Sequence, residues 1–276
     1  MKLNFESTAR LNNGVQIPRL GFGTWRLAPG EETENGVSLA LESGYRHIDT
    51  ASQYGNEESV GNAIKKSGIS ESEIFVTTKL WDDDHGFNTV LQAFETSRKK
   101  LQLEIIDLYL IHFPVKDHLR KDTWQGMQAV LDTGKCRSIG VSNFSVQQLV
   151  EIFSFCKVPP AANQIELHPY MFQAQKEVVE FCQKEGIAIE AYRPLTKGAK
   201  FNDERITRIA AGYGKSPAQV LIRWSLDHGF VVIPKSSHRE RILENCDLFN
   251  FELTAEEIQT LDSFETISFM GAKVTA

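Results

Sequence analysis

Short apolar segments rich in β-branched residues alternate along the chain with longer segments whose apolar residues recur at helical spacing. Eight of the short segments predict strands, at residues 20–24, 47–50, 74–80, 106–112, 136–142, 161–167, 187–192 and 230–234. Most are apolar almost without interruption, which is typical of parallel strands that are covered on both faces. The pattern therefore predicts an α/β fold built on a parallel sheet.

Glycines and capping residues mark where helices end and begin. The segments at 31–43 and 57–67 have helical spacing and are followed by Gly44 and Gly68, at positions where a left-handed residue is favoured. A threonine three residues before a glutamate, at 254 and 257, forms a capping box that predicts an extra helix near the C-terminus. Near the N-terminus, the Asn-Gly pair at 13–14 lies between apolar flanks and predicts a β-hairpin that caps one end of the fold.

Eight alternating units without a linker rich in Pro, Gly or Ser favour a single (β/α)8 TIM barrel over residues 1–276. A doubly wound sheet is the alternative, but its phosphate-binding motif G-x-G-x-x-G fails here because Arg26 stands at the last glycine position. Gly214-Lys-Ser resembles the end of a Walker loop, yet Ile209 replaces the first glycine of that motif. Ser216 and Pro217 instead predict the start of a helix.

Composition narrows the class of protein. The 276 residues are 41% hydrophobic and 24% charged, as in globular proteins, and the formal net charge of −6 argues against a nucleic-acid partner. No apolar run approaches the roughly 20 residues that a transmembrane helix needs, and no secretory signal is visible. The four cysteines are far apart, so we expect no metal site, and buried thiols in a reducing cytoplasm. No long apolar stripe demands a partner, and we expect a monomer.

Four polar residues lie at or just beyond the predicted strand ends, where barrel enzymes place their active sites: Asp49, Tyr54, Lys79 and His112. A lysine held near a carboxylate stays charged, and its field is expected to lower the pKa of a nearby tyrosine below the usual value of about 10. A neighbouring histidine can orient a carbonyl oxygen and share in proton transfer. Because no nucleophile or metal motif is present, these acid–base groups need a cofactor to supply electrons.

The segment 233–245 is the candidate anchor for that cofactor. Lys235 lies at the end of the last predicted strand, and Arg241 lies in the helix that follows. Helix N-termini favour anions, so this segment can form a phosphate clamp. An exposed helical turn with no ligand is the alternative interpretation of the segment taken alone.

From about residue 11 to about residue 264 the chain resembles the aldo-keto reductases. The similarity rests on Leu-Gly-Phe-Gly-Thr-Trp at 20–25, Gly-Tyr-Arg-His-Ile-Asp-Thr-Ala at 44–51, Tyr-Gly-Asn-Glu at 54–57, Phe-Val-Thr-Thr-Lys-Leu-Trp at 75–81, Asp-Leu-Tyr-Leu-Ile-His at 107–112, Gly-Val-Ser-Asn-Phe at 140–144, Asn-Gln-Ile-Glu-Leu-His-Pro at 163–169 and the 233–245 segment. The resemblance implies a catalytic tetrad of Asp49, Tyr54, Lys79 and His112, with Tyr54 as the general acid. It also implies a nicotinamide cofactor, usually NADPH, bound without a Rossmann domain.

The resemblance assigns cofactor contacts position by position. It places Ser142, Asn143 and Gln164 on the nicotinamide amide and Tyr192 under the nicotinamide ring. The remaining contacts that it implies are Thr24 and Trp25 at the ribose, Arg193, Leu195 and Lys197 at the pyrophosphate, Lys235, Ser236 and Arg241 at the adenosine 2′-phosphate, Glu244 and Asn245 at the adenine, and Ile233 as a further cofactor contact. An arginine and a lysine near the 2′-phosphate favour NADPH over NADH, because only NADPH offers a dianionic group there.

The chain departs from the family pattern at three places. Arg193 replaces a frequent serine, which can strengthen pyrophosphate binding, and Phe113 replaces a frequent tryptophan. The loop at 114–122 is short, and the tail at 268–276 lacks the Arg-x-Gly-x-Asp-Pro ending of many relatives. We therefore expect an open substrate pocket with Trp25, Trp81 and Phe113 as its apolar walls.

The leading hypothesis is an NADPH-dependent oxidoreductase that reduces a small aldehyde or ketone to an alcohol, with Tyr54 as proton donor. A barrel that binds NADPH as a regulatory subunit is the alternative, although pure binding needs no complete tetrad. An aldolase or isomerase would use Lys79 differently and leave Tyr54 and His112 without roles. The sequence does not identify the substrate.

Overall fold

The computed structural model describes residues 3–267, so the tail at 268–276 lies outside the described residues. Eight parallel strands form one sheet in the order β10-β9-β8-β7-β6-β5-β4-β3, as the apolar segments predict. A parallel bridge between Leu20, just before the first of these strands, and Val232 in the last strand closes the barrel. The strands are β3 (Phe22–Gly23), β4 (His47–Asp49), β5 (Phe75–Leu80), β6 (Ile106–Ile111), β7 (Cys136–Ser142), β8 (Ala162–Glu166), β9 (Ala188–Tyr192) and β10 (Val231–Val232).

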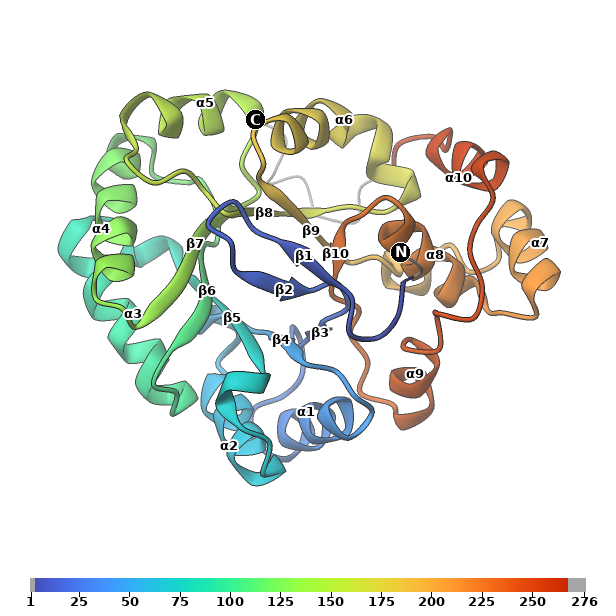
Figure 1. Ribbon diagram of the computed structural model, residues 1–276, viewed down its shortest axis with the longest axis horizontal. Helices are drawn as coiled ribbons and strands as arrows, with labels where there is room; N and C mark the ends of the chain where they lie inside the picture. Colours follow the sequence, from blue (N-terminus) through green and yellow to red (C-terminus); the bar gives the residue numbers. More distant parts are fainter. Residues whose placement is uncertain (1–2, 268–276) are drawn as a thin grey trace.

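Helices surround this barrel (Figure 1). In the described part of the chain they are α1 (Glu31–Glu42), α2 (Glu57–Ser67), α3 (Phe87–Leu101), α4 (Arg120–Asp132), α5 (Val146–Phe155), α6 (Pro169–Lys184), α7 (Glu204–Tyr213), α8 (Pro217–Asp227), α9 (Arg239–Glu244) and α10 (Ala255–Asp262). The unit after β9 contains two helices, α7 and α8, where strict alternation predicts one. The sheet and helices together confirm the predicted (β/α)8 barrel.

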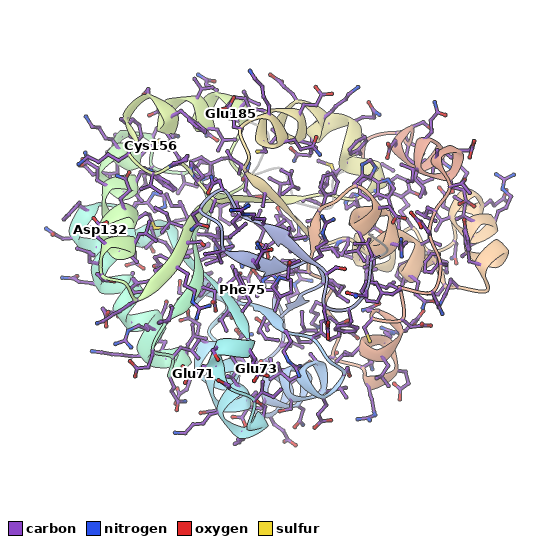
Figure 2. The ribbon with its side chains drawn as sticks, viewed as in Figure 1. Glu71, Glu73, Phe75, Asp132, Cys156 and Glu185 are labelled. Atoms are coloured by element: carbon purple, nitrogen blue, oxygen red, sulfur yellow. The ribbon has the colours of Figure 1, made fainter. Side chains whose placement is uncertain are left out.

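The predicted hairpin forms from β1 (Thr8–Arg10) and β2 (Gln16–Pro18) and lies across the barrel axis (Figure 1). Its turn uses Gly14 at φ 90°, a conformation that glycine adopts without strain. Leu11 and Ile17 pack on residues at the starts of barrel strands, among them Phe75 and Val231. In Figure 2, Phe75 lies near the centre of the molecule while Glu71, Asp132 and Glu185 lie toward its edge. The hairpin therefore plugs the N-terminal end and leaves the C-terminal end open.

The predicted helix ends are present. Gly44 and Gly68 both have positive φ after α1 and α2, and α1 ends one residue before the predicted boundary. The Thr254 hydroxyl and the Glu257 side chain form the capping box of α10, and Ser216 caps α8 with Pro217 at its first position. Within residues 3–267, none of the helices is long and apolar enough to cross a membrane.

Candidate active site

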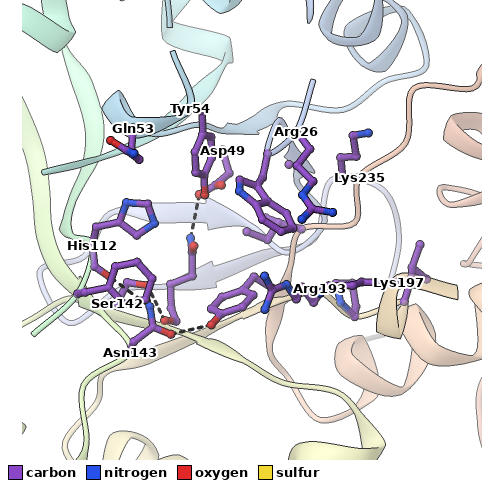
Figure 3. A pocket seen from close by; sticks show the side chains of 18 of the residues that line it. Arg26, Asp49, Gln53, Tyr54, His112, Ser142, Asn143, Arg193, Lys197 and Lys235 are labelled. Carbon is purple, nitrogen blue, oxygen red and sulfur yellow. Dashed lines mark hydrogen bonds between the residues drawn. The ribbon is translucent and has the colours of Figure 1, made fainter. Parts of the chain in front are cut away.

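A cavity of about 570 Å³ opens at the C-terminal ends of the barrel strands (Figure 3). Its wall combines three of the four tetrad residues, Asp49, Tyr54 and His112, with many of the residues that the sequence assigns to the cofactor and the substrate. Residues on its lining include Trp25, Trp81, Phe113, Ser142, Asn143, Gln164, Tyr192, Arg193, Leu195, Lys197, Ile233 and Lys235. Lys79 lies just beneath the wall and is fully buried.

Asp49, Lys79 and Tyr54 form one contiguous polar cluster. The Lys79 ammonium donates to both carboxylate oxygens of Asp49 at 2.8 Å, to the carbonyl of Thr50 at 2.8 Å and to the Tyr54 hydroxyl at 3.5 Å. Gln164 donates to Asp49 at 2.8 Å. Because both hydrogen-bond partners of the Asp49 carboxyl, Lys79 and Gln164, are donors, the geometry fits a carboxylate paired with an ammonium ion.

The charges around the cluster correct one expectation from the sequence. Burial acts to lower the pKa of Lys79, but Asp49, Tyr54 and Glu190 outweigh it and hold that pKa above its ordinary value, so the ammonium stays charged. Burial raises the pKa of Tyr54 above its ordinary value, although Lys79 acts to lower it. The expectation that the Tyr54 pKa falls below 10 is therefore wrong for the free protein, because desolvation of the phenolate exceeds the effect of the lysine.

His112 lies across the cavity from this cluster. Its ring centre is 5.8 Å from that of Tyr54 and 5.2 Å from that of Trp81, and its ring stacks on Phe113 at 4.8 Å. Burial, together with Lys79, lowers the pKa of His112 to about 2, so its imidazole is neutral at physiological pH. A neutral imidazole can donate one hydrogen bond to a carbonyl oxygen, and it carries no extra proton to deliver.

The residues assigned to the nicotinamide amide are already connected. Ser142 donates to the carbonyl of Gln164 at 2.9 Å, and Asn143 donates to the carbonyl of His112 at 3.1 Å. The Tyr192 hydroxyl donates to Asn143 Oδ1 at 2.7 Å. Asn143 has φ 64°, a left-handed conformation that asparagine tolerates better than most residues. This network fixes the Tyr192 ring and the amide side chains before any ligand arrives.

Arg193 takes an unusual place at the rim of the cavity. Its guanidinium carbon lies 4.7 Å from the ring centre of Trp25 and 5.6 Å from that of Tyr192, and its Nη1 lies 3.6 Å from Glu166. Arg26 lies over the same Trp25 ring at 4.4 Å. Two guanidinium groups thus flank one indole, and with Lys197 and Lys235 they make this side of the cavity cationic (Figure 3).

A second cavity of about 590 Å³ shares Leu195, Lys197 and Lys235 with the first, so the two form one groove. Its wall contains the other residues that the sequence assigns to the 2′-phosphate and the adenine, namely Ser236, Arg241, Glu244 and Asn245. A groove with aromatic faces at one end and cations in the middle and at the far end suits a long ligand that carries phosphates.

One predicted contact residue is placed differently. Thr24 is fully buried, donates its hydroxyl to the carbonyl of Asp49 at 3.0 Å and lines neither cavity. Conversely, Arg26 and Gln53 line the first cavity without having been predicted. Each is adjacent in sequence to a predicted site residue, Trp25 or Tyr54, and this adjacency is the feature of the sequence that could have indicated a place in the site.

The fold and this site define a barrel oxidoreductase in which acid–base residues adjoin a groove for a phosphate-bearing cofactor. The Aldo/keto reductase family model matches residues 19–266. The chain belongs to this family, which confirms the sequence-based identification, the activity class of an NADPH-dependent reductase of carbonyl compounds, and the nicotinamide cofactor.

Three named relatives are 40–48% identical to this chain. A glyoxal reductase of Bacillus subtilis is 45% identical over 98% of this chain and 97% of its own length. A 9,11-endoperoxide prostaglandin H2 reductase of Trypanosoma cruzi is 48% identical over 95% and 92%. An aldo-keto reductase of Bombyx mori, solved in complex with NADP, is 40% identical over 95% of this chain and 94% of its own, with a TM-score of 0.88.

Proposed function

We propose that this protein reduces small aldehydes and ketones to alcohols with NADPH, using Tyr54 as the proton donor. The observation that carries the proposal is the cluster in which the buried Lys79 ammonium contacts both Asp49 and the Tyr54 hydroxyl at the wall of the cavity. The lysine stabilises the phenolate that remains after the proton has left. The enzyme is then an alcohol:NADP oxidoreductase, and the same residues serve the reverse oxidation.

His112 and the aromatic walls position the substrate. The neutral His112 imidazole faces the Tyr54 ring, so a carbonyl oxygen between them receives a hydrogen bond from each. Trp25, Trp81 and Phe113 provide an apolar surface for the rest of the molecule. Because the named relatives act on substrates as different as glyoxal and prostaglandin H2, we propose a small carbonyl compound without naming one.

The residues present fit NADPH. Bound NADPH supplies the hydride, and this chain supplies its binding groove. We propose that Tyr192 stacks on the nicotinamide and that Ser142, Asn143 and Gln164 bind its amide. The side chains of Arg193 and Lys197, with the chain at Leu195, hold the pyrophosphate region, and Ile233 lines the same cavity. The 2′-phosphate is bound by Lys235, Ser236 and Arg241, and the adenine by Glu244 and Asn245. All five residues line the second cavity, and Lys235 lines the first cavity as well.

Tyr54→Phe tests the role of the phenol. It removes the acidic proton and keeps the ring, so turnover of an aromatic aldehyde should fall by about 10²- to 10⁴-fold. Because the phenol touches no proposed cofactor-binding group, the Kd for NADPH, followed by quenching of protein fluorescence, should change less than about threefold. Retained turnover would contradict the assigned role, and a wild type that binds NADPH but reduces no carbonyl compound would favour a regulatory NADPH-binding subunit.

We further propose that residues 1–276 form a single domain and that the protein is a cytoplasmic monomer. All four cysteines are free, and Cys136 and Cys182 are buried, which suits a reducing compartment. Light scattering coupled to size-exclusion chromatography tests the monomer, and a dimer mass would contradict it.

A further inference from the structure

A carboxyl group that the proposed mechanism does not use lies inside the barrel, beneath the catalytic cluster. Glu190 is on β9, paired in register with Gln164 of β8 and Val231 of β10, and its exposed fraction is 0%. Its Oε1 lies 3.4 Å from Nε2 of His47 on β4. Since β9 and β4 are not neighbours in the sheet, this contact crosses the barrel interior.

Neither carboxyl oxygen of Glu190 accepts a geometrically complete hydrogen bond. The Gln164 amide that faces it donates to Asp49 at 2.8 Å. His47 is no counter-ion, because burial and Lys79 lower its pKa to about 3, and its Nε2 lies 3.0 Å from the Thr77 hydroxyl. Lys79 is committed to Asp49, Thr50 and Tyr54. An ionised carboxylate with so little compensation in a buried interior is strongly disfavoured.

We propose that Glu190 is kept as a neutral carboxylic acid beneath the Asp49–Lys79 pair and that its neutrality is what keeps Tyr54 an effective proton donor. Asp49 and Lys79 cancel in charge, so a neutral Glu190 leaves the buried cluster without net charge. An ionised Glu190 adds one negative charge, which disfavours the phenolate that Tyr54 must become. Glu190 is thus a positioning residue that acts through the electrostatics of the tetrad, and the inference rests on the proposed function.

The surroundings of Glu190 determine where it ionises. The charged and titratable groups that face it are His47 and Asp49 from β4, Tyr54 from the turn after β4 and Lys79 from β5. The Gln164 amide from β8 faces it as well. Burial first and Asp49 second raise the pKa of Glu190 to about 8, against Gln164 and Lys79. A negative charge on Glu190 raises the pKa of Tyr54 further. Reduction should therefore slow as pH rises through about 8.

The kinetic test compares wild type with Glu190→Gln, which keeps the size of the side chain and cannot ionise. Single-turnover oxidation of NADPH by an aromatic aldehyde isolates the chemical step from product release. We expect equal rates near neutral pH, and an alkaline decline in Glu190→Gln that begins about one pH unit or more above that of wild type. Coinciding profiles would overturn the proposal.

Asp107→Asn is the matched control. Asp107 is also a buried strand carboxyl, and burial raises its pKa to about 6, but it contacts the Val76 amide and Arg137 rather than the cluster. This variant should keep the wild-type profile. An Asp107→Asn profile shifted as far as that of Glu190→Gln would show that any lost carboxyl has the effect, and would overturn the specific role of Glu190.

Infrared spectroscopy tests the protonated acid without turnover and without any variant that must fold. Wild type near neutral pH should show the carbonyl band of a protonated carboxyl group, and the band should disappear as pH rises through about 8. Absence of the band in wild type, or its persistence in folded Glu190→Gln, would overturn the inference. If wild type shows the band and reduces no carbonyl compound, the proposed function fails, and with it the link to Tyr54.

Discussion

The ammonium nitrogen of Lys79 lies 2.8 Å from each carboxylate oxygen of Asp49, and both residues are buried at the end of adjacent strands. Two opposite charges so placed are far from water, and each depends on the other for compensation. The pair therefore couples the stability of the barrel to the chemistry of Tyr54, which receives a hydrogen bond from the same ammonium group.

Removing one partner should destabilise the fold more than removing both. Asp49→Asn and Lys79→Met should each lower the free energy of unfolding by about 3–5 kcal/mol, because each leaves a buried charge without its partner. The double variant carries neither charge and should recover most of that loss, while turnover remains as low as in Lys79→Met. Urea unfolding and aldehyde reduction at neutral pH measure both. Additive losses of stability in the double variant would show that the pair is not coupled.

Arg193 and Arg241 should differ in their effect on the two nicotinamide cofactors. Arg241→Ala should weaken the binding of NADPH by about 1.5–3 kcal/mol and leave the binding of NADH almost unchanged, because only NADPH carries the 2′-phosphate. Arg193→Ser should weaken both cofactors to a similar extent, since both have a pyrophosphate. Fluorescence titration gives the four dissociation constants.

The control for both variants is Lys176→Ala, which removes a cation from the exposed face of α6. It should leave both affinities unchanged. Equal losses of affinity for NADPH and NADH in Arg241→Ala would show that Arg241 does not bind the 2′-phosphate. A loss of affinity confined to NADPH in Arg193→Ser would show that Arg193 does not bind the pyrophosphate.

His85 should make the fold sensitive to acid. It is 6% exposed with both ring nitrogens lacking hydrogen-bond partners, and burial, with Lys116 and Arg120, lowers its pKa to about 4. The unfolded chain takes up this proton near pH 6.5 and the folded chain only near 4, so stability falls as pH drops through that window. The loss is about 1.4 kcal/mol per pH unit and about 3 kcal/mol in all.

His85→Phe tests whether His85 causes the loss of stability in acid, because it replaces the ring with one that does not titrate. Stability at neutral pH should change by less than about 1.5 kcal/mol, and urea unfolding at pH 7 and pH 5 should show a smaller acid loss than wild type by about 2 kcal/mol. His118→Gln, at an exposed position in the 3-10 turn Asp117–Leu119 after β6, should leave the acid loss as it is. An unchanged acid loss in His85→Phe would refute the role of His85.

The sequence pattern located the barrel strands because buried parallel strands need apolar side chains on both faces, and that need is visible locally. The pattern predicted strands at 20–24 and 230–234 that are longer than those in the structure, where β3 and β10 have two residues each. The extent of a ladder depends on its partner, and here the first and last strands meet through one bridge, Leu20 with Val232. Such long-range pairing leaves no local signal.

The electrostatics of the site could be predicted only in part. The positions of Asp49, Tyr54, Lys79 and His112 at the strand ends follow from the barrel, but the balance between burial and the lysine field at Tyr54 requires coordinates. Glu190 is also visible in the sequence, since a glutamate inside the apolar run at 187–192 must be buried if the strand is buried. Charged residues within buried strands are therefore worth the same attention as those at strand ends.

The contact between α2 and α3 should require a glycine at position 61. A Cβ added to Gly61 would lie 2.2 Å from the carbonyl oxygen of Leu101, which is backbone and has little freedom to move. Gly61→Ala should therefore lower the free energy of unfolding by about 1–3 kcal/mol or more.

Gly212→Ala is the matched control, because Gly212 lies in helix α7 with no atom within 4 Å of an added Cβ, and it should raise stability by about 0.5–1 kcal/mol. Opposite signs for the same chemical change, measured by urea unfolding, would show that backbone approach and not helix propensity decides at position 61. A stabilising Gly61→Ala would mean that α2 and α3 lie farther apart than described.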